Sequence, residues 1–405
     1  MKPIVRAGRM KPVHSDIRGP LFVEAMKRQK QGIDILKLNT GNPATFGFGL
    51  PDSIKNALME HMQDGVGYCD FKGMPQARQA ICDYETSKGI KGITSDDVFI
   101  GNGVSEVVSF ALTPLLNDGD EVLVPSPSYS LWGNSVYLED GKPVFYTCDE
   151  KANWYPDIQD IRSKITEKTK AIVIINPNNP TGVLYPKELL LEIIQIAREF
   201  GLLIFADEIY DRLVMDGKQH ISLASLTEDV PVITLNGLSK SHCLCGYRCG
   251  WMVISGPREL TEDYRQGIIQ LTSLRLCANT LAQIVIPAAL DDMDTPASMV
   301  RPGGRIYEQR EATVRELEKI DGLSFVKNDA AFYVFPKLDV KKFNITNDKQ
   351  FAHDLLDATN ILLVPGSGFD WKDPDHFRIV MLPQADVLSD AIRRMGTFLD
   401  GYKQK

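Results

Sequence analysis

Short apolar segments alternate with longer amphipathic segments between about residues 95 and 290. Seven of the apolar segments are rich in β-branched residues and predict strands; they cover residues 98–100, 121–124, 143–146, 171–175, 202–205, 232–235 and 251–254. Residues 171–175, Ala-Ile-Val-Ile-Ile, are continuously apolar, which is typical of a parallel strand covered on both faces by helices. The alternation predicts an α/β fold with a large domain built on a mostly parallel, seven-stranded sheet between helices.

Residues 188–200 show the helical half of this pattern. Their apolar positions recur at helical spacing, and charged side chains occupy the other face at Glu192, Arg198 and Glu199. The apolar set is Leu189, Leu190, Ile193, Ile194 and Ile196. We expect a helix that covers one face of the sheet.

The pattern changes towards both ends of the chain. A long charged helix is predicted near 305–320, strands near 332–335 and 377–381, and an amphipathic helix at 385–399. The first fifty residues predict an extended arm, a helix near 23–32 and a strand at 35–38, and we expect them to pack with the C-terminal part. The expected division is an N-terminal arm with part of the small domain (1–50), a large domain (51–300) and a small α+β C-terminal domain (301–405).

Composition narrows the possible partners. The chain has 405 residues, 43% hydrophobic and 24% charged, which is ordinary for a globular protein of two or three domains. A net charge of −8 argues against nucleic-acid binding and against binding to acidic membranes. No apolar stretch is long enough to cross a bilayer, and the first residues lack the apolar core of a signal peptide. We therefore expect a cytoplasmic protein.

Seven cysteines are irregularly spaced, which favours reduced thiols over a disulfide framework. Three of them, Cys243, Cys245 and Cys249, form a C-x-C-x-x-x-C pattern. This spacing is not a usual zinc pattern, and no second pair follows it. We interpret the three as small residues that fill a crowded turn, and we expect no metal.

The most informative residue is Lys240, which follows the predicted strand 232–235 and precedes Arg248 by eight positions. A lysine just past a buried strand is poorly hydrated, which lowers its pKa and makes a neutral, nucleophilic amine accessible. An arginine nearby can hold a phosphate through two parallel hydrogen bonds. An amine that attacks an aldehyde, next to a cation that holds a phosphate, is what pyridoxal phosphate requires. The alternative is a surface lysine after a strand.

Other strand ends carry polar signals, and ligands of open α/β sheets bind at those ends. Residues 101–106, Gly-Asn-Gly-Val-Ser-Glu, offer backbone N–H groups to a phosphate at a helix start, or form a simple N-cap. Residues 176–182, Asn-Pro-Asn-Asn-Pro-Thr-Gly, form a rigid turn with amides that can donate to a ligand. Asp207 lies in an apolar setting and needs a cationic partner, which a protonated pyridine nitrogen would supply. Tyr210 follows three residues later.

Together with these segments, further motifs make the chain resemble the class I aminotransferases of PLP fold type I over nearly its whole length. The closest likeness is to the bacterial alanine aminotransferase (glutamate–pyruvate aminotransferase) group. The motifs that carry it are residues 16–20 (Asp-Ile-Arg-Gly-Pro), 41–43 (Gly-Asn-Pro), 67–70 (Gly-Tyr-Cys-Asp), 176–182, 275–279 (Arg-Leu-Cys-Ala-Asn) and 374–380 (Pro-Asp-His-Phe-Arg-Ile-Val).

The resemblance implies the cofactor pyridoxal 5'-phosphate (PLP) and roles for the residues around its ring. Lys240 would bind the cofactor aldehyde through a covalent carbon–nitrogen link and would then move the proton. Asp207 would keep the ring nitrogen protonated. Tyr210 and Asn179 would bond the phenolate oxygen of the ring, and Tyr129 would stack on the ring face.

The resemblance also implies a phosphate site and a shared active site. The residues that would bind the phosphate are Gly103, Val104, Ser105, Ser239 and Arg248. Tyr68 of the partner subunit would assist them, which implies a homodimer.

The resemblance implies that Arg378 binds the substrate carboxylate through two parallel hydrogen bonds. It also implies that the Gly41 backbone and Asn179 lie beside that carboxylate. The alternative for Arg378 is a surface arginine at the end of a strand. Arg18 and Arg275 could contact a second carboxylate or make ion pairs between domains. Cys243 departs from the arginine that related sequences often carry there, and Ala330 replaces a common glycine.

The implied reaction is the ping-pong transfer of an amino group between L-alanine and 2-oxoglutarate, which gives pyruvate and L-glutamate. A broad aliphatic or aromatic aminotransferase is the alternative, followed by a PLP-dependent carbon–sulfur β-lyase. A PLP-sensing transcription factor is disfavoured because residues 1–50 show no helix-turn-helix. A nicotinamide dehydrogenase is disfavoured because residues 101–106 lack the third glycine of G-x-G-x-x-G.

Overall fold

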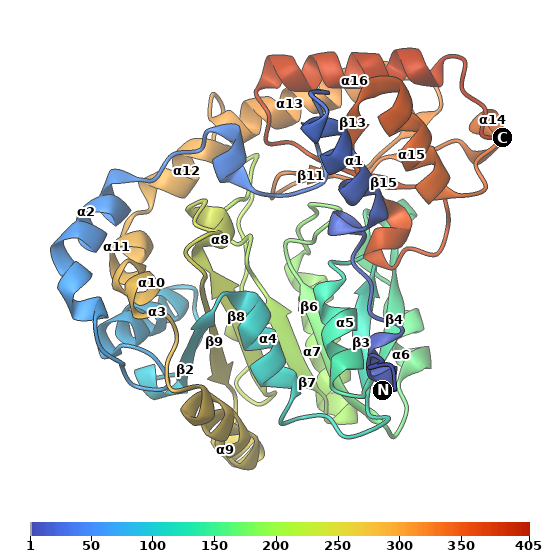
Figure 1. Ribbon diagram of the computed structural model, residues 1–405. Helices are drawn as coiled ribbons and strands as arrows, with labels where there is room; N and C mark the ends of the chain where they lie inside the picture. Colours follow the sequence, from blue (N-terminus) through green and yellow to red (C-terminus); the bar gives the residue numbers. More distant parts are fainter. Residues whose placement is uncertain (1) are drawn as a thin grey trace.

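The structure, a computed structural model, describes residues 2–405 and is built around one eight-stranded sheet (Figure 1). The strand order is β2-β9-β8-β7-β6-β3-β4-β5. The bounds are β2 Val98–Asn102, β3 Glu121–Ser126, β4 Lys142–Asp149, β5 Tyr155–Pro156, β6 Thr169–Ile175, β7 Leu203–Asp207, β8 Val232–Gly237 and β9 Cys249–Ser255.

The α/β fold with a mostly parallel sheet is confirmed, and all seven predicted strands lie in it. Neighbouring strands run parallel to each other along the order β4-β3-β6-β7-β8. Strand β9 runs antiparallel to both β8 and β2. The eighth strand, β5, has two residues and pairs antiparallel with the end of β4, so it is too short to leave a periodic pattern in the sequence.

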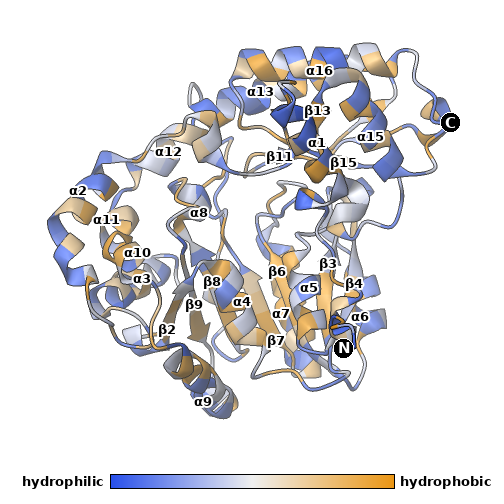
Figure 2. Cartoon of the chain, viewed as in Figure 1, coloured by the Kyte–Doolittle hydropathy of each residue, from blue (hydrophilic) through white to orange (hydrophobic). Residues whose placement is uncertain are grey.

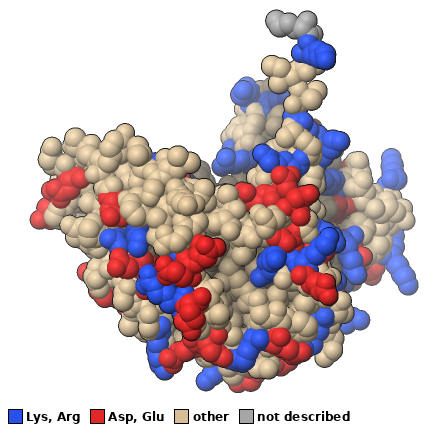
Figure 3. Space-filling view, turned by 90° about the horizontal axis from the view of Figure 1, so that it is seen from below, with Lys and Arg blue, Asp and Glu red and all other residues tan. Residues whose placement is uncertain are grey.

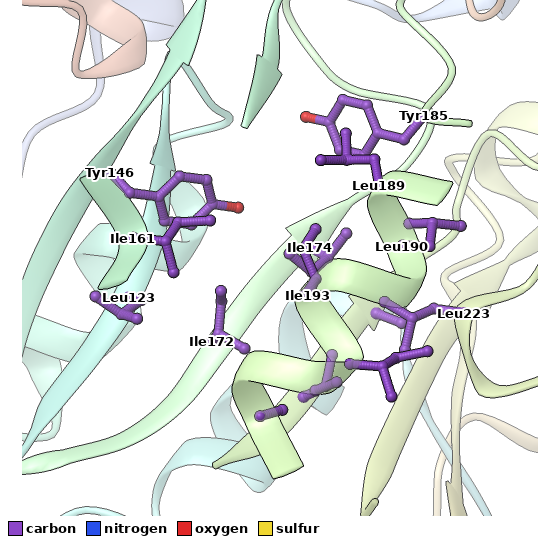
Figure 4. Close-up of a cluster of buried hydrophobic side chains, with 14 of the residues drawn as sticks. Leu123, Tyr146, Ile161, Ile172, Ile174, Tyr185, Leu189, Leu190, Ile193 and Leu223 are labelled. Atoms are coloured by element: carbon purple, nitrogen blue, oxygen red, sulfur yellow. The ribbon is translucent and has the colours of Figure 1, made fainter. Parts of the chain in front are cut away.

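Helices cover both faces of this sheet because successive residues of the buried strands point to opposite sides. Ile172 and Ile174 of β6 pack with α6 (Ile158–Lys164) and α7 (Lys187–Phe200), and Figure 4 shows this cluster. The alternate positions of β6 pack with α4 (Val104–Leu112), α5 (Leu131–Leu138) and α9 (Arg258–Arg275) on the other face. The sheet is accordingly apolar throughout its centre (Figure 2).

A second core lies in the C-terminal part of the chain and includes Leu38, Leu317, Phe351, Phe377 and Ile392. The three-stranded sheet there has the order β11-β15-β14, and β1 pairs with β13. The short strands are β1 Leu36–Lys37, β10 Leu323–Ser324, β11 Tyr333–Val334, β12 Lys337–Leu338, β13 Ile361–Leu362, β14 Val364–Pro365 and β15 Phe377–Val380. Through the β1–β13 pair the N-terminal segment packs against the C-terminal part.

The remaining helices frame these two cores (Figure 1). They are α1 Pro20–Lys30, α2 Asp52–His61, α3 Pro75–Ser87, α8 Leu238–Ser241, α10 Thr280–Ile284, α11 Ile286–Asp291, α12 Asp294–Val300, α13 Arg305–Leu317, α14 Val340–Phe343, α15 Asp348–Thr359 and α16 Ala385–Leu399. Among the described residues no single helix is long and apolar enough to cross a membrane; α9 together with the following α10–α11 passes by length and composition, but the two parts are bent by 120°.

The carboxyl ends of β6, β7 and β8 point towards the C-terminal part, with α8 at the end of β8 (Figure 1). Parallel neighbours end at the same edge of a sheet, so residues 176–182, Asp207 and Lys240 are brought to one place although the chain separates them. The segment from Leu38 to Gly41 and strand β15 reach the same place from the other side, since Val380 N–H donates to the Leu38 carbonyl.

Candidate active site

Lys240 stands in the one-turn helix α8 directly after the buried strand β8. Gly237 ends that strand and lies against β9, where a Cβ atom would come within 2.5 Å of the Cys249 carbonyl oxygen, so no side chain fits there. The half-buried Lys240 Nζ donates a hydrogen bond to the Gly41 carbonyl at 3.1 Å and lies 5.8 Å from the centre of the Phe332 ring. The amine therefore reaches from the large sheet to the N-terminal segment.

Asp207 is the last residue of β7 and is 5% exposed. The Trp132 indole N–H donates to its Oδ2 at 3.1 Å, and the Ile209 N–H donates to its Oδ1 at 3.4 Å. Burial raises the pKa of Asp207 to about 6, although these two donors oppose the rise. The carboxylate is therefore held in place by neutral donors and is receptive to a cation, which a protonated ring nitrogen would provide.

The start of α4 offers groups that could hold an anion. Gly103 precedes the helix with φ +81°, and a Cβ atom there would overlap the Arg248 guanidinium. A Cβ atom on Gly250 would overlap the Val104 N atom. Glycine at both positions lets Arg248 lie against the first free N–H groups of α4, where the helix dipole also favours an anion. These residues fit the phosphate group of PLP.

Arg378 of β15 is a buried cation, 1% exposed. Its Nη1 donates to Asn179 Oδ1 at 2.9 Å, and its Nη2 donates to the Asn39 carbonyl. The guanidinium lies 4.6 Å from the ring centres of both Tyr333 and Phe369. Burial lowers its pKa, and its Nε has no hydrogen-bond partner in the described part of the chain. Such a group can bind a carboxylate with two parallel hydrogen bonds.

Tyr210 and Tyr333 join the two halves of the site. Their hydroxyl oxygens are 2.9 Å apart, and both side chains are buried. A Cβ atom at Gly41 would overlap the Tyr333 hydroxyl, so position 41 accepts only glycine in this arrangement. Burial, first, and then the neighbouring Tyr333 raise the pKa of Tyr210 well above its usual value, so its hydroxyl stays protonated and able to donate.

The other predicted residues differ in their surroundings. Ser239 is buried in α8, and Tyr129 precedes α5 close enough to influence the charge of Arg378. Tyr68 is 84% exposed, on the outside of the molecule. Arg18 is exposed in the segment before α1.

Arg275 is bonded within the large domain. Its Nη1 contacts Glu106 Oε2 at 2.5 Å, and its Nη2 donates to the carbonyls of Phe71 and Ile100 at 3.3 and 3.2 Å. These bonds favour a structural role for Arg275 over contact with a second carboxylate.

The three clustered cysteines pack in the turn after α8. Cys249 Sγ donates to the Ala282 carbonyl, and Cys245 Sγ donates to Asn42 Oδ1 at 3.1 Å. Burial raises the pKa of Cys243 and of Cys249 to about 12, so neither is a reactive thiolate at neutral pH. These contacts agree with the interpretation of the cysteines as packing residues.

Two residues of the site were missed by the sequence reasoning. Trp132 belongs to the apolar set of α5, and Tyr333 belongs to an apolar segment, so both look like ordinary core residues. Only the indole N–H of Trp132 and the hydroxyl of Tyr333 could have indicated a role in the site, because buried groups of these kinds usually find a polar partner.

Comparison with known proteins agrees with this geometry. The family "Aminotransferase class I and II" matches residues 33–394. The chain is 50% identical to glutamate-pyruvate aminotransferase AlaA of Haemophilus influenzae over 404 residues, 100% of both chains, and 45% identical to an alanine aminotransferase of Mycobacterium tuberculosis over 100% of this chain and 94% of that one. The crystal structure of an aminotransferase from Escherichia coli superposes with a TM-score of 0.98 at 47% identity, covering 100% of both chains. The chain therefore belongs to the class I and II aminotransferases and is a PLP-dependent enzyme.

Proposed function

We propose that the enzyme transfers the amino group between L-alanine and 2-oxoglutarate, with pyruvate and L-glutamate as the products. The observation that carries the substrate pair is the full-length likeness to relatives named glutamate-pyruvate aminotransferase and alanine aminotransferase. The buried, incompletely bonded Arg378 supports an α-carboxylate as the common feature of all four substrates.

Arg378 binds the substrate carboxylate in this proposal. Its guanidinium is fixed between Tyr333 and Phe369, so little side-chain entropy remains to be lost when the substrate binds. Asn179 holds one Nη through its amide oxygen, and the Gly41 carbonyl borders the same space by accepting from Lys240. The carboxylate would thus be anchored next to the lysine amine.

Lys240 supplies the amine that binds the cofactor and then acts as the base that moves the substrate Cα proton. PLP, when bound, supplies an aldehyde for that amine and a ring that accepts electrons. Asp207, held by Trp132, would favour the protonated ring nitrogen. Proton transfer by a positioned base contributes roughly 10²–10⁴-fold to the rate. Tyr129 would stack on the face of the cofactor ring. The cofactor phosphate would be bound by Gly103, Val104, Ser105, Ser239 and Arg248.

We further propose a cytoplasmic homodimer in which Tyr68 of the partner subunit reaches the phosphate. Apolar side chains are exposed around Tyr68 in sequence and on α9 and α10, namely Met59, Met62, Val66, Leu274, Leu276 and Leu281. Exposed apolar groups that gather in this way mark association surfaces. Figure 3 shows a largely uncharged area on the α2 side of the molecule, next to a surface where both charges mix. The division into residues 1–50, 51–300 and 301–405 remains part of this proposal.

The test is a half-reaction of the PLP-loaded enzyme with single amino acids. L-Alanine and L-glutamate should bleach the yellow colour, and pyruvate or 2-oxoglutarate should restore it. Lys240→Ala should bind PLP and fail to bleach, while Lys91→Ala, on the exposed surface, should behave like the parent. Restoration only by aromatic or branched keto acids would overturn the alanine assignment. A pocket distinguishes substrates one methylene apart by only about 1–3 kcal/mol, so weaker bleaching by similar amino acids is expected.

Pyruvate release from cystathionine without any keto acid would instead identify a carbon–sulfur lyase. Borohydride reduction of the yellow enzyme followed by peptide mapping checks the residue itself. An adduct anywhere other than Lys240 would remove that lysine from the proposed mechanism.

A further inference from the structure

Two phenol hydroxyls meet at the junction between the large sheet and the C-terminal part. Tyr210 follows the end of β7, and Tyr333 belongs to β11, 123 residues later. Their oxygen atoms are 2.9 Å apart, and their rings meet edge to face with centres 5.6 Å apart. Tyr333 is 2% exposed and Tyr210 3% exposed, so water does not compete for this contact from the outside.

Either hydroxyl can be the donor in this hydrogen bond, and the two directions leave different protons free for a ligand. Within residues 2–405, each of these two hydroxyls has only the other as a hydrogen-bond partner. Each phenol carries one proton. If Tyr210 donated to Tyr333, its only proton would be used, and Tyr210 could accept but not donate to a ligand. If Tyr333 donates to Tyr210, the Tyr210 proton stays free to donate into the site.

We propose that Tyr333 is a positioning residue that donates its hydroxyl proton to Tyr210 and so directs the Tyr210 proton to the phenolate oxygen of the cofactor. This inference rests on the proposed function and on the role that the family resemblance implies for Tyr210, a hydrogen bond to that oxygen. The Tyr333 hydroxyl is fixed for this task because it packs against Gly41, where no side chain fits. A hydrogen bond received by a hydroxyl also strengthens the one that it donates.

The ring of Tyr333 has a second, separable contact. Its face lies 4.6 Å from the Arg378 guanidinium, so the ring helps to hold the substrate-binding cation. Phenylalanine at position 333 keeps the ring and removes only the hydroxyl. The substitution Tyr333→Phe therefore separates the proposed hydrogen bond from the support of Arg378.

Other charged and titratable groups surround the two phenols and must stay unchanged in the test. Asp207 of β7 and Arg378 of β15 both act on Tyr210, and Tyr129 before α5 acts on Arg378. Lys240 of α8 lies over the neighbouring Phe332 ring. None of these groups is altered by the substitutions Tyr333→Phe and Tyr210→Phe.

The experiment measures the apparent pKa at which the yellow colour of the PLP-loaded enzyme is lost. A hydrogen-bond donor to the phenolate oxygen stabilises the deprotonated chromophore more than the protonated one. In the protonated form a neighbouring proton already offsets the negative charge of the phenolate. Tyr210→Phe should therefore raise this pKa. Tyr333→Phe should raise it by about half a unit to one unit, the scale of one neutral hydrogen bond. In the double variant, Tyr333→Phe should add nothing to the effect of Tyr210→Phe.

The matched control is Tyr146→Phe, which removes a buried hydroxyl that donates to the Val173 carbonyl in the sheet core at 2.8 Å. It should leave the chromophore pKa unchanged. Gly41→Ala supplies a second perturbation, since its added methyl must displace the Tyr333 hydroxyl, and it should raise the pKa only while Tyr210 is present. PLP affinity of the cofactor-free protein, followed by equilibrium titration, should fall in parallel.

The outcomes separate this inference from the proposed function. A yellow parent enzyme whose pKa responds to Tyr210→Phe but not to Tyr333→Phe overturns the inference alone. Equal shifts from Tyr333→Phe with and without Tyr210 also overturn it, because Tyr333 would then act without Tyr210. Failure of the parent enzyme to form a chromophore on Lys240 overturns the proposed function itself.

Discussion

Replacing the buried Asp207 by asparagine should make the cofactor-free protein more stable at neutral pH while weakening its hold on PLP. Burial raises the pKa of Asp207 from 3.8 to about 6. A shift of about two units corresponds to about 3 kcal/mol at about 1.36 kcal/mol per unit. The carboxylate therefore opposes folding until a cation binds next to it, whereas asparagine carries no charge to bury.

The sign of the effect fixes its pH window. Folded protein binds the Asp207 proton more tightly than unfolded protein, so the free energy of unfolding falls as the pH rises from 3.8 to about 6 and then levels off. In the Asp207→Asn variant the free energy of unfolding does not undergo this fall, because asparagine does not titrate. Its amide oxygen can still accept from Trp132, but its NH₂ group would face the Ile209 N–H, and losing that bond costs about 1 kcal/mol. The net gain at pH 7.5 should be about 2 kcal/mol.

Urea unfolding of the PLP-free proteins at pH 5.0 and 7.5, at one protein concentration, measures this gain. The stability difference between Asp207→Asn and the parent should be larger at pH 7.5 than at pH 5.0. PLP should stabilise the parent much more than the variant. Asp34→Asn, at an exposed position, is the control and should change nothing. A variant that is less stable than the parent at pH 7.5, or a difference that does not depend on pH, would refute the reasoning.

Three further changes test other parts of the structure. Gly103→Ala should weaken PLP binding by about tenfold or more, because its methyl displaces Arg248, while pyridoxal without phosphate should bind as before in absorbance titrations. Lys88→Met should lower the free energy of unfolding by about 3–5 kcal/mol in urea, because Lys88 pairs with the buried carboxylates of Glu85, Glu208 and Asp211 at 2.6–3.1 Å. Lys91→Met, which removes an exposed pair, should cost less than about 1 kcal/mol. His14 pairs with Asp16 and Asp370, and these carboxylates raise its pKa from 6.5 to about 9. Its contribution to docking of the N-terminal segment is therefore complete below pH 6.5 and lost as the pH rises through 9. Proteolysis of that segment should accelerate over this range in the parent and should not change with pH in His14→Gln.

Much of the fold could be predicted because buried parallel strands leave continuous apolar runs, as in residues 171–175. The direction of β9 is a different matter. The connection from β8 to β9 spans only Leu238 to Arg248 and contains one helical turn, which is short for a parallel crossover. The length of this connection thus indicated an antiparallel strand, whereas the apolar periodicity did not indicate the strand's direction. The two-residue strand β5 left no signal of either kind.

The candidate residues that the sequence marked are polar groups in places where a core would exclude them. Asp207 and Lys240 stand at the ends of buried strands, and the structure brings both to one edge of the sheet. Trp132 and Tyr333 could not be found in this way, because each completes an apolar pattern and its polar atom is a small part of the side chain. Their partners lie 75 and 123 residues away, and only the folded chain shows which polar atoms meet.

The site keeps one buried anion and one buried cation apart. Neither Asp207 nor Arg378 has an ion pair with any described residue, and burial opposes the charge of both. Pairing them with each other would relieve both costs and would remove both binding groups. The fold prevents this by placing Asp207 in the large sheet and Arg378 in a separate sheet, with the Tyr210–Tyr333 contact joining their surroundings. In the proposed function the cofactor nitrogen and the substrate carboxylate supply the opposite charges, so their binding would recover the folding energy that burying Asp207 and Arg378 costs.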